Sequence, residues 1–271
     1  NWFMMYFLSV VLIGTVYPIF LDVISNEKIS VGPPFYQKLI VPFLIPFLLF
    51  MSLGPRLKWI KSKIENKKSL IIYFLILVIL TFFIIKNLTT DLLFYTVLVS
   101  AAFFLFFTTL KELFIKKFDN ASQTLAHFGF SLLILSILFN GILSSEITTN
   151  IRVGEKYIYS KGEIFFKKME QKKESNFDSI IAYFEIKDES GKTVELKPEI
   201  RIYNQPEIIT SEADIKTTLL EDKFLVMNLV KGNEYFNIRY QIKPFMIWIW
   251  ISVLLLSLGG LMSLFKRKYE K

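Results

Sequence analysis

The sequence contains no cysteine and only one histidine, His127. The lack of cysteine excludes disulfides, thiolate metal sites and thiol nucleophiles from this chain. Side chains that ligate a transition metal or a heme iron strongly are therefore almost missing. If the chain binds such a metal, His127 is the ligand that it brings.

Long apolar runs are abundant. The chain is 53% hydrophobic and 16% aromatic, and its mean hydropathy is +0.45. These values place it among membrane proteins. A spanning helix needs roughly 20 mostly apolar residues, and six stretches qualify: Phe3–Ile24, Phe35–Leu53, Leu70–Ile85, Leu92–Leu110, Leu125–Leu143 and Phe245–Phe265. The chain starts at Asn1, at the entrance to the first run, which is typical of a piece of a longer polypeptide.

The predicted fold is a polytopic α-helical bundle of about six transmembrane helices, with a small β-rich barrel or sandwich between the fifth and sixth. Residues 1–143 form the five-helix region, residues 144–243 the external domain, and residues 244–271 the last helix and a basic tail. Strands are expected at Ile180–Ile186, Thr193–Tyr203, Phe224–Val230 and Tyr235–Ile242, with further strands at Tyr157–Tyr159 and Ile164–Lys168. Gly191 and Gly232 suit the tight turns between them. The external domain contains no nucleophile–base set, which favours docking over catalysis.

Lys and Arg are distributed unevenly over the loops. Residues 55–68, residues 111–119 and the tail hold 13 basic residues, whereas the two short loops on the other side hold three, Lys28, Lys38 and Lys86. The positive-inside rule places the basic side in the cytoplasm. The external domain then lies in a bacterial periplasm, with a mitochondrial inner membrane as the alternative location. Because topology accounts for the basic charge, nucleic-acid binding is not expected.

His127 opens the fifth apolar run, and ionisable residues at membrane depth usually mark functional sites. Helical spacing places Gln123, Thr124 and Ser131 on its face. One reading is an axial heme ligand, with Ala126 and Gly129 leaving room for a porphyrin and Phe128 and Phe130 packing on it. The second ligand would then be Met51, Met262 or a histidine from another segment. Another is a packing residue that is hydrogen-bonded to a neighbouring helix. A proton or substrate relay is the third.

The last run opens with Lys243-Pro244 and carries Trp248 and Trp250. Pro244 is expected in the first helical turn, where proline is tolerated. The two tryptophans are expected to act as interfacial anchors.

Several short motifs resemble one family, the CcmF heme lyases of cytochrome c-type biogenesis. The motifs occur in the family's order along nearly the whole chain. They are Lys28-Ile29-Ser30-Val31-Gly32-Pro33-Pro34-Phe35, Ala126-His127-Phe128-Gly129, Pro198-Glu199-Ile200-Arg201-Ile202-Tyr203, Thr210-Ser211-Glu212-Ala213-Asp214-Ile215, and Lys243 to Trp250 followed by Leu258-Gly259-Gly260-Leu261.

The resemblance implies that His127 is one axial ligand of a transmembrane heme b, with Gln123, Phe128, Gly129 and Ser131 as its candidate surroundings. It also implies partners: the heme chaperone CcmE, CcmH-type proteins that present apocytochrome c, apocytochrome c itself, and the N-terminal part of the same protein. Membrane lipid surrounds the helices. The implied reaction is covalent attachment of heme to apocytochrome c.

The sequence departs from the family in one important respect. Its four tryptophans form no WWD segment, and the family's other heme-ligating histidines are absent. The resemblance therefore covers the C-terminal portion, as a fragment or a split subunit, and this chain alone is not expected to catalyse ligation. Alternatives are the related lyase for nitrite-reductase hemes, a membrane scaffold without a cofactor, and half of a transporter.

Overall fold

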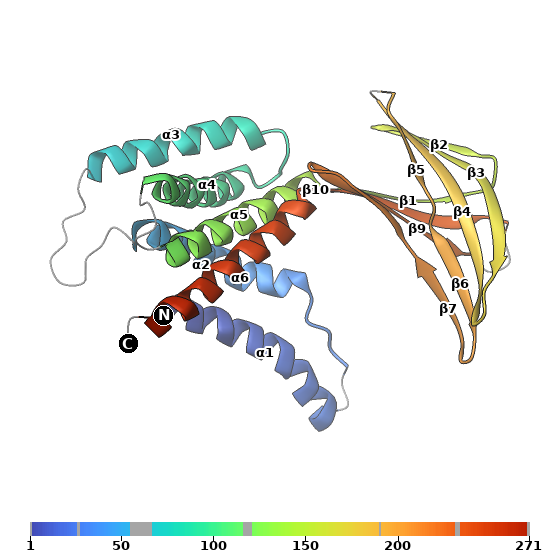
Figure 1. Ribbon diagram of the computed structural model, residues 1–271, viewed down its shortest axis with the longest axis horizontal. Helices are drawn as coiled ribbons and strands as arrows, with labels where there is room; N and C mark the ends of the chain where they lie inside the picture. The colour runs from blue at the N-terminus through green and yellow to red at the C-terminus, as the bar shows by residue number, and fades with distance from the viewer. Residues whose placement is uncertain are drawn as a thin grey trace. The chain divides into compact units, whose positions relative to one another are not determined.

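The computed structural model describes residues 2–25, 28–54, 67–115, 121–189, 191–230 and 234–269. All six expected spans are helices: α1 (Trp2–Ser25), α2 (Pro33–Leu53), α3 (Lys67–Ile85), α4 (Leu92–Ile115), α5 (Ala121–Leu143) and α6 (Met246–Tyr269). Each is long and apolar enough to cross a membrane. The prediction of a six-helix membrane protein with an inserted β domain is confirmed (Figure 1).

The chain divides into two compact units. One comprises Asn1–Leu135 and Ser252–Lys271, and the other comprises Ser136–Ile251. The divisions fall within α5 and α6, so the β unit is several residues longer at each end than the external domain expected at residues 144–243. The helical unit and the β unit are described separately below.

Helix α4 is the central element of the helical unit. Leu98, Ala101, Ala102 and Leu105 are fully or almost fully buried, and both α2 and α3 pack on this helix. Aromatic side chains join α1 to α2, as in the pair Tyr6 and Phe43, whose ring centroids are 4.4 Å apart. The small alanines let neighbouring helices approach α4 closely, which is how membrane helices commonly associate.

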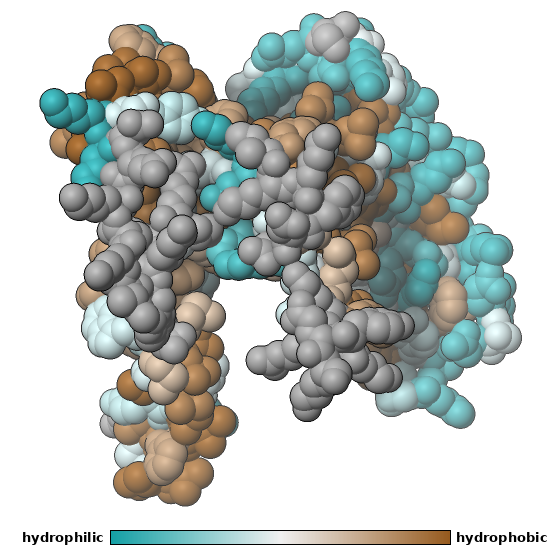
Figure 2. Space-filling model, turned by 60° about the vertical axis from the view of Figure 1, so that its left-hand side comes forward, coloured by the Kyte–Doolittle hydropathy of each residue, from teal (hydrophilic) through white to brown (hydrophobic). Residues whose placement is uncertain are grey.

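The other helices present large apolar side chains to their surroundings, among them Leu8, Phe20 and Phe83. Figure 2 shows brown, hydrophobic residues over the exposed helix surface, whereas teal, hydrophilic residues predominate on the β domain. In water such a surface would be costly, because roughly 25 cal/mol per Å² of apolar surface favours its removal. A bilayer is the environment that this surface suits.

The β domain consists of two antiparallel sheets. The first has the order β1-β10-β9-β8 and the second the order β2-β3-β4-β6-β7, with β5 also paired to β4. The strands are β1 (Ser145–Ile151), β2 (Lys156–Tyr159), β3 (Gly162–Lys173), β4 (Phe177–Asp188), β5 (Thr193–Leu196), β6 (Glu199–Asn204), β7 (Glu207–Glu212), β8 (Asp214–Thr217), β9 (Glu221–Leu229) and β10 (Phe236–Pro244).

Alternating residues of both sheets form one apolar core. Phe166 and Phe184 stack within the second sheet at 4.2 Å, and Phe166 meets Phe236 of the first sheet edge-on at 5.7 Å. Such inward alternation from two facing sheets is typical of a sandwich. The expected β-rich fold is therefore confirmed as a sandwich.

Some strand predictions need correction. The run Thr193–Tyr203 is two strands, β5 and β6, which both pair with β4; the break falls at Lys197 and Pro198, and proline cannot donate a ladder hydrogen bond. Gly191 has the expected positive φ, 81°, while Gly232 lies outside the described residues. Strands β1, β7 and β8 had not been predicted.

The start of the last span also differs from expectation. Pro244 ends β10, where it is opposite Glu221, and is not part of the helix. Phe245 has a φ of 61°, and α6 begins at Met246. The chain thus turns from sheet to helix at a single residue in the left-handed region, which is uncommon for a side chain of this size.

Candidate functional site

His127 lies six residues after the start of α5, which is about 9 Å along the helix at 1.5 Å per residue. Its side chain is half-buried. The two residues one turn further along identify its neighbours. Phe130 meets Phe47 of α2 edge-on at 5.9 Å, and the Ser131 hydroxyl lies 3.1 Å from the Thr109 hydroxyl of α4. Because residues three and four apart share a helix face, His127 is expected on the face of α5 that meets α2 and α4.

A sulfur atom and a carboxylate lie near the same level. Consecutive spans alternate in direction, so α2 and α4 both run antiparallel to α5. Met51 follows Phe47 by one turn on α2 and is therefore expected level with His127. Glu112 follows Thr109 by three residues on α4, so its carboxylate is also expected near the level of His127. Among the described residues, His127 makes no hydrogen bond.

Two of the expected surroundings face α4. The rings of Phe128 and Phe106 are 5.5 Å apart. The Ser131 hydroxyl donates to the Phe128 carbonyl at 2.8 Å, in addition to its contact with Thr109. Gln123 is exposed. These side chains therefore surround His127 on α5 without bonding to its imidazole, and Ser131 joins α5 to α4.

Gly129 has a different role from the one expected. A Cβ at Gly129 would lie 2.9 Å from the Leu256 backbone nitrogen, and a Cβ at Gly259 would lie 2.7 Å from the Ala126 nitrogen. Helices α5 and α6 thus touch backbone to backbone here. The space predicted beside Ala126 and Gly129 for a porphyrin is filled by α6, so any flat cofactor at His127 must lie on the side of α2 and α4.

The donor set fits a heme iron better than a bare metal ion. Within the described residues, no group of three or more His, Asp or Glu side chains could hold a metal. A heme iron takes its equatorial ligands from the porphyrin and needs only axial ligands from protein. A half-buried imidazole that makes no hydrogen bond among the described residues can supply one.

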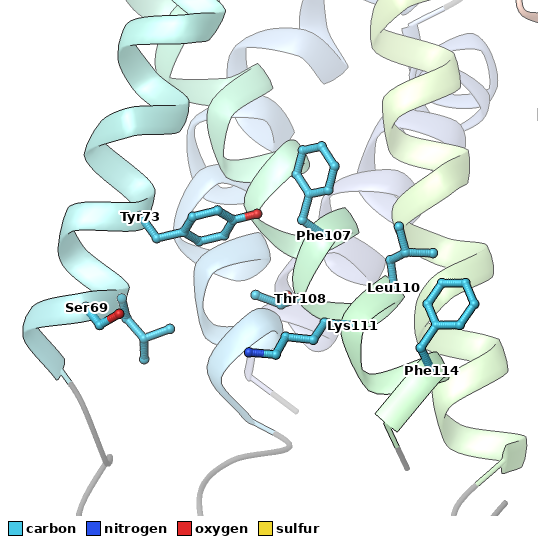
Figure 3. Close-up of a pocket in the computed structure, with 8 residues that line it drawn as sticks. Ser69, Tyr73, Phe107, Thr108, Leu110, Lys111 and Phe114 are labelled. Atoms are coloured by element: carbon cyan, nitrogen blue, oxygen red, sulfur yellow. The ribbon is translucent and has the colours of Figure 1, made fainter. Parts of the chain in front are cut away.

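A groove lies between α3 and α4, with a volume of about 460 Å³. Figure 3 shows Tyr73 of α3 directed toward α4 and Lys111 of α4 directed toward α3. No sequence motif indicated this site. It becomes visible only when the two helices are placed together.

Comparisons with known proteins agree with the architecture. Residues 142–244, which hold all ten strands, match the family model described as the CcmF C-terminal beta-sandwich. The chain is 24% identical to the cytochrome c-type biogenesis protein CcmF of Pseudomonas fluorescens, over 97% of this chain and 42% of that protein. The chain is therefore similar to the C-terminal portion of CcmF.

Two further matches extend this relationship. The chain is 25% identical to the cytochrome c-type biogenesis protein NrfE of Haemophilus influenzae, over 96% of this chain and 42% of that protein. A solved structure of the cytochrome c heme lyase CcmF has the same fold, with a TM-score of 0.71 and 19% identity over 96% of this chain and 44% of that one. The chain thus spans less than half the length of these CcmF relatives, and the expected resemblance to the C-terminal portion is confirmed.

Two contacts of this chain were missed by sequence reasoning. The Asn140 side-chain amide donates to the Pro244 carbonyl at 2.6 Å, and the Trp248 indole donates to the Leu219 carbonyl at 2.9 Å. Both bonds join residues far apart in the chain. A lone Asn near the end of an apolar run is a weak signal of such a bond. Trp248 had been interpreted as an anchor, and its indole nitrogen gave no indication of a partner.

Proposed function

We propose that this chain is the C-terminal part of a cytochrome c heme lyase, and that His127 is one axial ligand of a heme b within the membrane. The main support for this proposal is His127. Its imidazole is half-buried and makes no hydrogen bond among the described residues, and it lies in a chain that is similar to CcmF. A heme held there would supply one-electron chemistry. The chain's own contribution is to hold the iron between α2 and α4 and to exclude water with phenylalanine side chains.

The depth of His127 separates this heme from the reaction it serves. Its position about 9 Å into α5 is close to the end of α5 that follows residues 116–120, whereas the β domain follows the opposite end. Heme that is attached to apocytochrome c must be handled on the β-domain side. The heme at His127 therefore suits an electron-transferring or structural role, and a second heme is the one attached.

The β domain is proposed as a docking surface on the periplasmic side. CcmE, CcmH-type proteins and apocytochrome c are the proposed partners, together with the N-terminal part of the same protein. Among its described residues the domain brings together no histidine and no metal-binding cluster. Docking is the role that this composition suits.

The heme assignment is tested by pyridine hemochrome content of the chain joined to its N-terminal part. His127→Ala should lose b-type heme and cytochrome c maturation together. Ile137→Ala, an exposed change on the same helix, is the control for protein yield. His127→Met should retain some heme at a raised potential, since thioether ligation favours ferrous iron. Wild-type heme content in purified His127→Ala would show that His127 is a helix-packing residue.

The similarity to NrfE favours a second candidate function, the attachment of heme to a nitrite reductase. The identities to CcmF and NrfE are nearly equal, 24% and 25%. Complementation of strains lacking one lyase or the other would distinguish them. Rescue of general c-type cytochromes supports the first candidate, and rescue of nitrite reductase alone supports the second.

A further inference from the structure

The groove between α3 and α4 combines apolar walls with a polar end. Leu70 of α3 and Phe107, Leu110 and Phe114 of α4 supply the walls. Ser69 and Lys111 lie toward the end of the groove where α3 begins, with the Lys111 ammonium directed into the space between the helices, and the Tyr73 hydroxyl lies farther in, level with Phe107 (Figure 3). The groove therefore suits a ligand that has both a polar head and an apolar tail.

The charge around the polar end is positive. Lys67 and Lys68, exposed in the first turn of α3, directly precede Ser69, the first residue of α3 that lines the groove. Among the described residues Lys111 forms no ion pair, and no carboxylate lines the groove. Lysines near the end of a spanning helix lie at the level of lipid headgroups. An anionic headgroup would match this charge.

We propose that the groove binds one anionic phospholipid. Its phosphate lies against Lys111 and Ser69, and an acyl chain passes Tyr73 and Phe107 toward the middle of the membrane. A soluble phosphate would leave the apolar walls uncovered, so the lipid is the source that accounts for both halves of the site. Basic residues attract anionic lipid by about 1 kcal/mol each, which corresponds to about a five-fold change in affinity.

The test is native mass spectrometry of the whole chain with added phosphatidylglycerol or phosphatidylcholine. Wild type should retain phosphatidylglycerol preferentially. Lys111→Gln should weaken that retention about five-fold, and Tyr73→Phe should weaken it less, because the ring stays packed on Phe104. Lys86→Gln removes the same charge at the other end of α3 and should change nothing.

Three outcomes would overturn the proposal. Equal retention of the two lipids would remove the role of headgroup charge. Equal loss in Lys111→Gln and Lys86→Gln would show general surface attraction. Displacement of the lipid by millimolar glycerol phosphate would show that the site takes a free phosphate. If Lys111→Gln does not fold, Phe107→Trp is the replacement test. The larger ring fills the groove and should abolish retention of the lipid.

A different observation concerns the turn Thr218–Leu220, between β8 and β9. Two hydrogen bonds fix this turn to the start of α6. The Phe245 amide donates to the Leu220 carbonyl at 2.8 Å, and the Trp248 indole donates to the Leu219 carbonyl at 2.9 Å. The side chains of Leu219 and Leu220 are nevertheless 66% and 69% exposed. Two leucines are thus held at the level where a membrane span begins.

We infer that Leu219 and Leu220 insert into the lipid at this boundary and so anchor the β domain to the bilayer. Exposed leucine side chains are unfavourable in water but suit the boundary between headgroups and acyl chains. Trp248, whose ring type favours that level, is bonded to the same turn. Contact with lipid explains why the two leucine side chains are exposed, and no partner protein is needed to cover them.

The lack of native cysteine allows single nitroxide labels to measure depth. Leu219→Cys and Leu220→Cys, labelled in nanodiscs, should collide with oxygen more than with a water-soluble nickel chelate. Ile158→Cys, on β2 with 78% exposure, is the aqueous control and should show the reverse. Nickel accessibility at Leu219 equal to that at Ile158 would overturn the inference. Protection from both reagents would also overturn it, because it would indicate a protein cover.

Discussion

Gly259 and Gly260 are neighbours in α6 with opposite surroundings. A Cβ at Gly259 would lie 2.7 Å from the Ala126 nitrogen and 2.9 Å from the Ser122 carbonyl oxygen, whereas a Cβ at Gly260 would meet nothing within 4 Å. Both contacts at Gly259 are to backbone, which cannot move aside as a side chain does. Helix α6 must shift as a whole to admit a methyl group there.

Gly259→Ala is therefore expected to destabilise the packing of α5 on α6 by about 1–3 kcal/mol, the usual cost of overpacking. Gly260→Ala should be neutral or slightly stabilising, since alanine favours helix over glycine by ~1 kcal/mol. Thermal unfolding in nanodiscs measures the difference. Because His127 adjoins Ala126, Gly259→Ala should also disturb a bound heme. Equal stability of the two variants would contradict the close contact.

At the scale of elements, one of the two hydrogen bonds that hold the turn before β9 comes from an indole. Trp248→Phe keeps an aromatic ring in α6 but removes the bond to the Leu219 carbonyl. It should reduce the protection of amides in the turn Thr218–Leu220 from hydrogen exchange by about 0.5–1.5 kcal/mol. Trp250→Phe, at a position 64% exposed, should leave that protection unchanged. Neither change should alter the heme spectrum, and a shifted band would place these rings at the cofactor.

One buried cation joins the two sheets. Lys223 of β9 is 7% exposed; its ammonium lies 3.7 Å from Asp188 of β4 and 3.5 Å from Glu221. The carboxylates are more exposed than the amine, so removing the amine and removing the carboxylates should have different effects on stability. Removing the amine leaves charges that water can reach, whereas removing both carboxylates leaves an unpaired buried charge.

The double change Asp188→Asn with Glu221→Gln is therefore expected to cost about 3 kcal/mol, and Lys223→Met about 1 kcal/mol or less. Urea unfolding of the β domain in the whole protein measures both. Glu163→Gln, which breaks the exposed pair with Lys156, is the control and should cost less than ~0.5 kcal/mol. If Lys223→Met costs more stability than the double change, the ion pairs themselves stabilise the domain, and neutralisation of the buried lysine is not the main effect.

For the whole molecule, hydropathy alone located every span, because a bilayer requires long uninterrupted apolar runs. Strands were harder to place. Strand β1 (Ser145–Ile151) alternates weakly, and β7 and β8 are short and largely exposed edge strands, so local pattern carried little signal. The face of His127 could be predicted from spacing, but its neighbours could not. That α6 fills the space beside Gly129 depends on a helix more than a hundred residues away.

The orientation of the molecule follows from charge. Residues 55–68, residues 111–119 and the tail hold 13 Lys and Arg, against three in the short loops on the other side. Segments rich in these residues stay in the cytoplasm during insertion. With α1 to α6 as alternating spans, residue 66 and the C-terminus are expected inside, and the β domain, with residue 192, outside.

Single cysteines test this orientation without background, because the chain has no native cysteine. A membrane-impermeant maleimide added to intact spheroplasts should label Lys192→Cys at once and label Asn66→Cys only after lysis. Ile158→Cys, also in the β domain, should follow Lys192→Cys. A reporter fused after Lys271 should indicate cytoplasm. Labelling of Asn66→Cys before lysis, with Lys192→Cys protected, would invert the molecule and place the β domain away from any periplasmic apocytochrome.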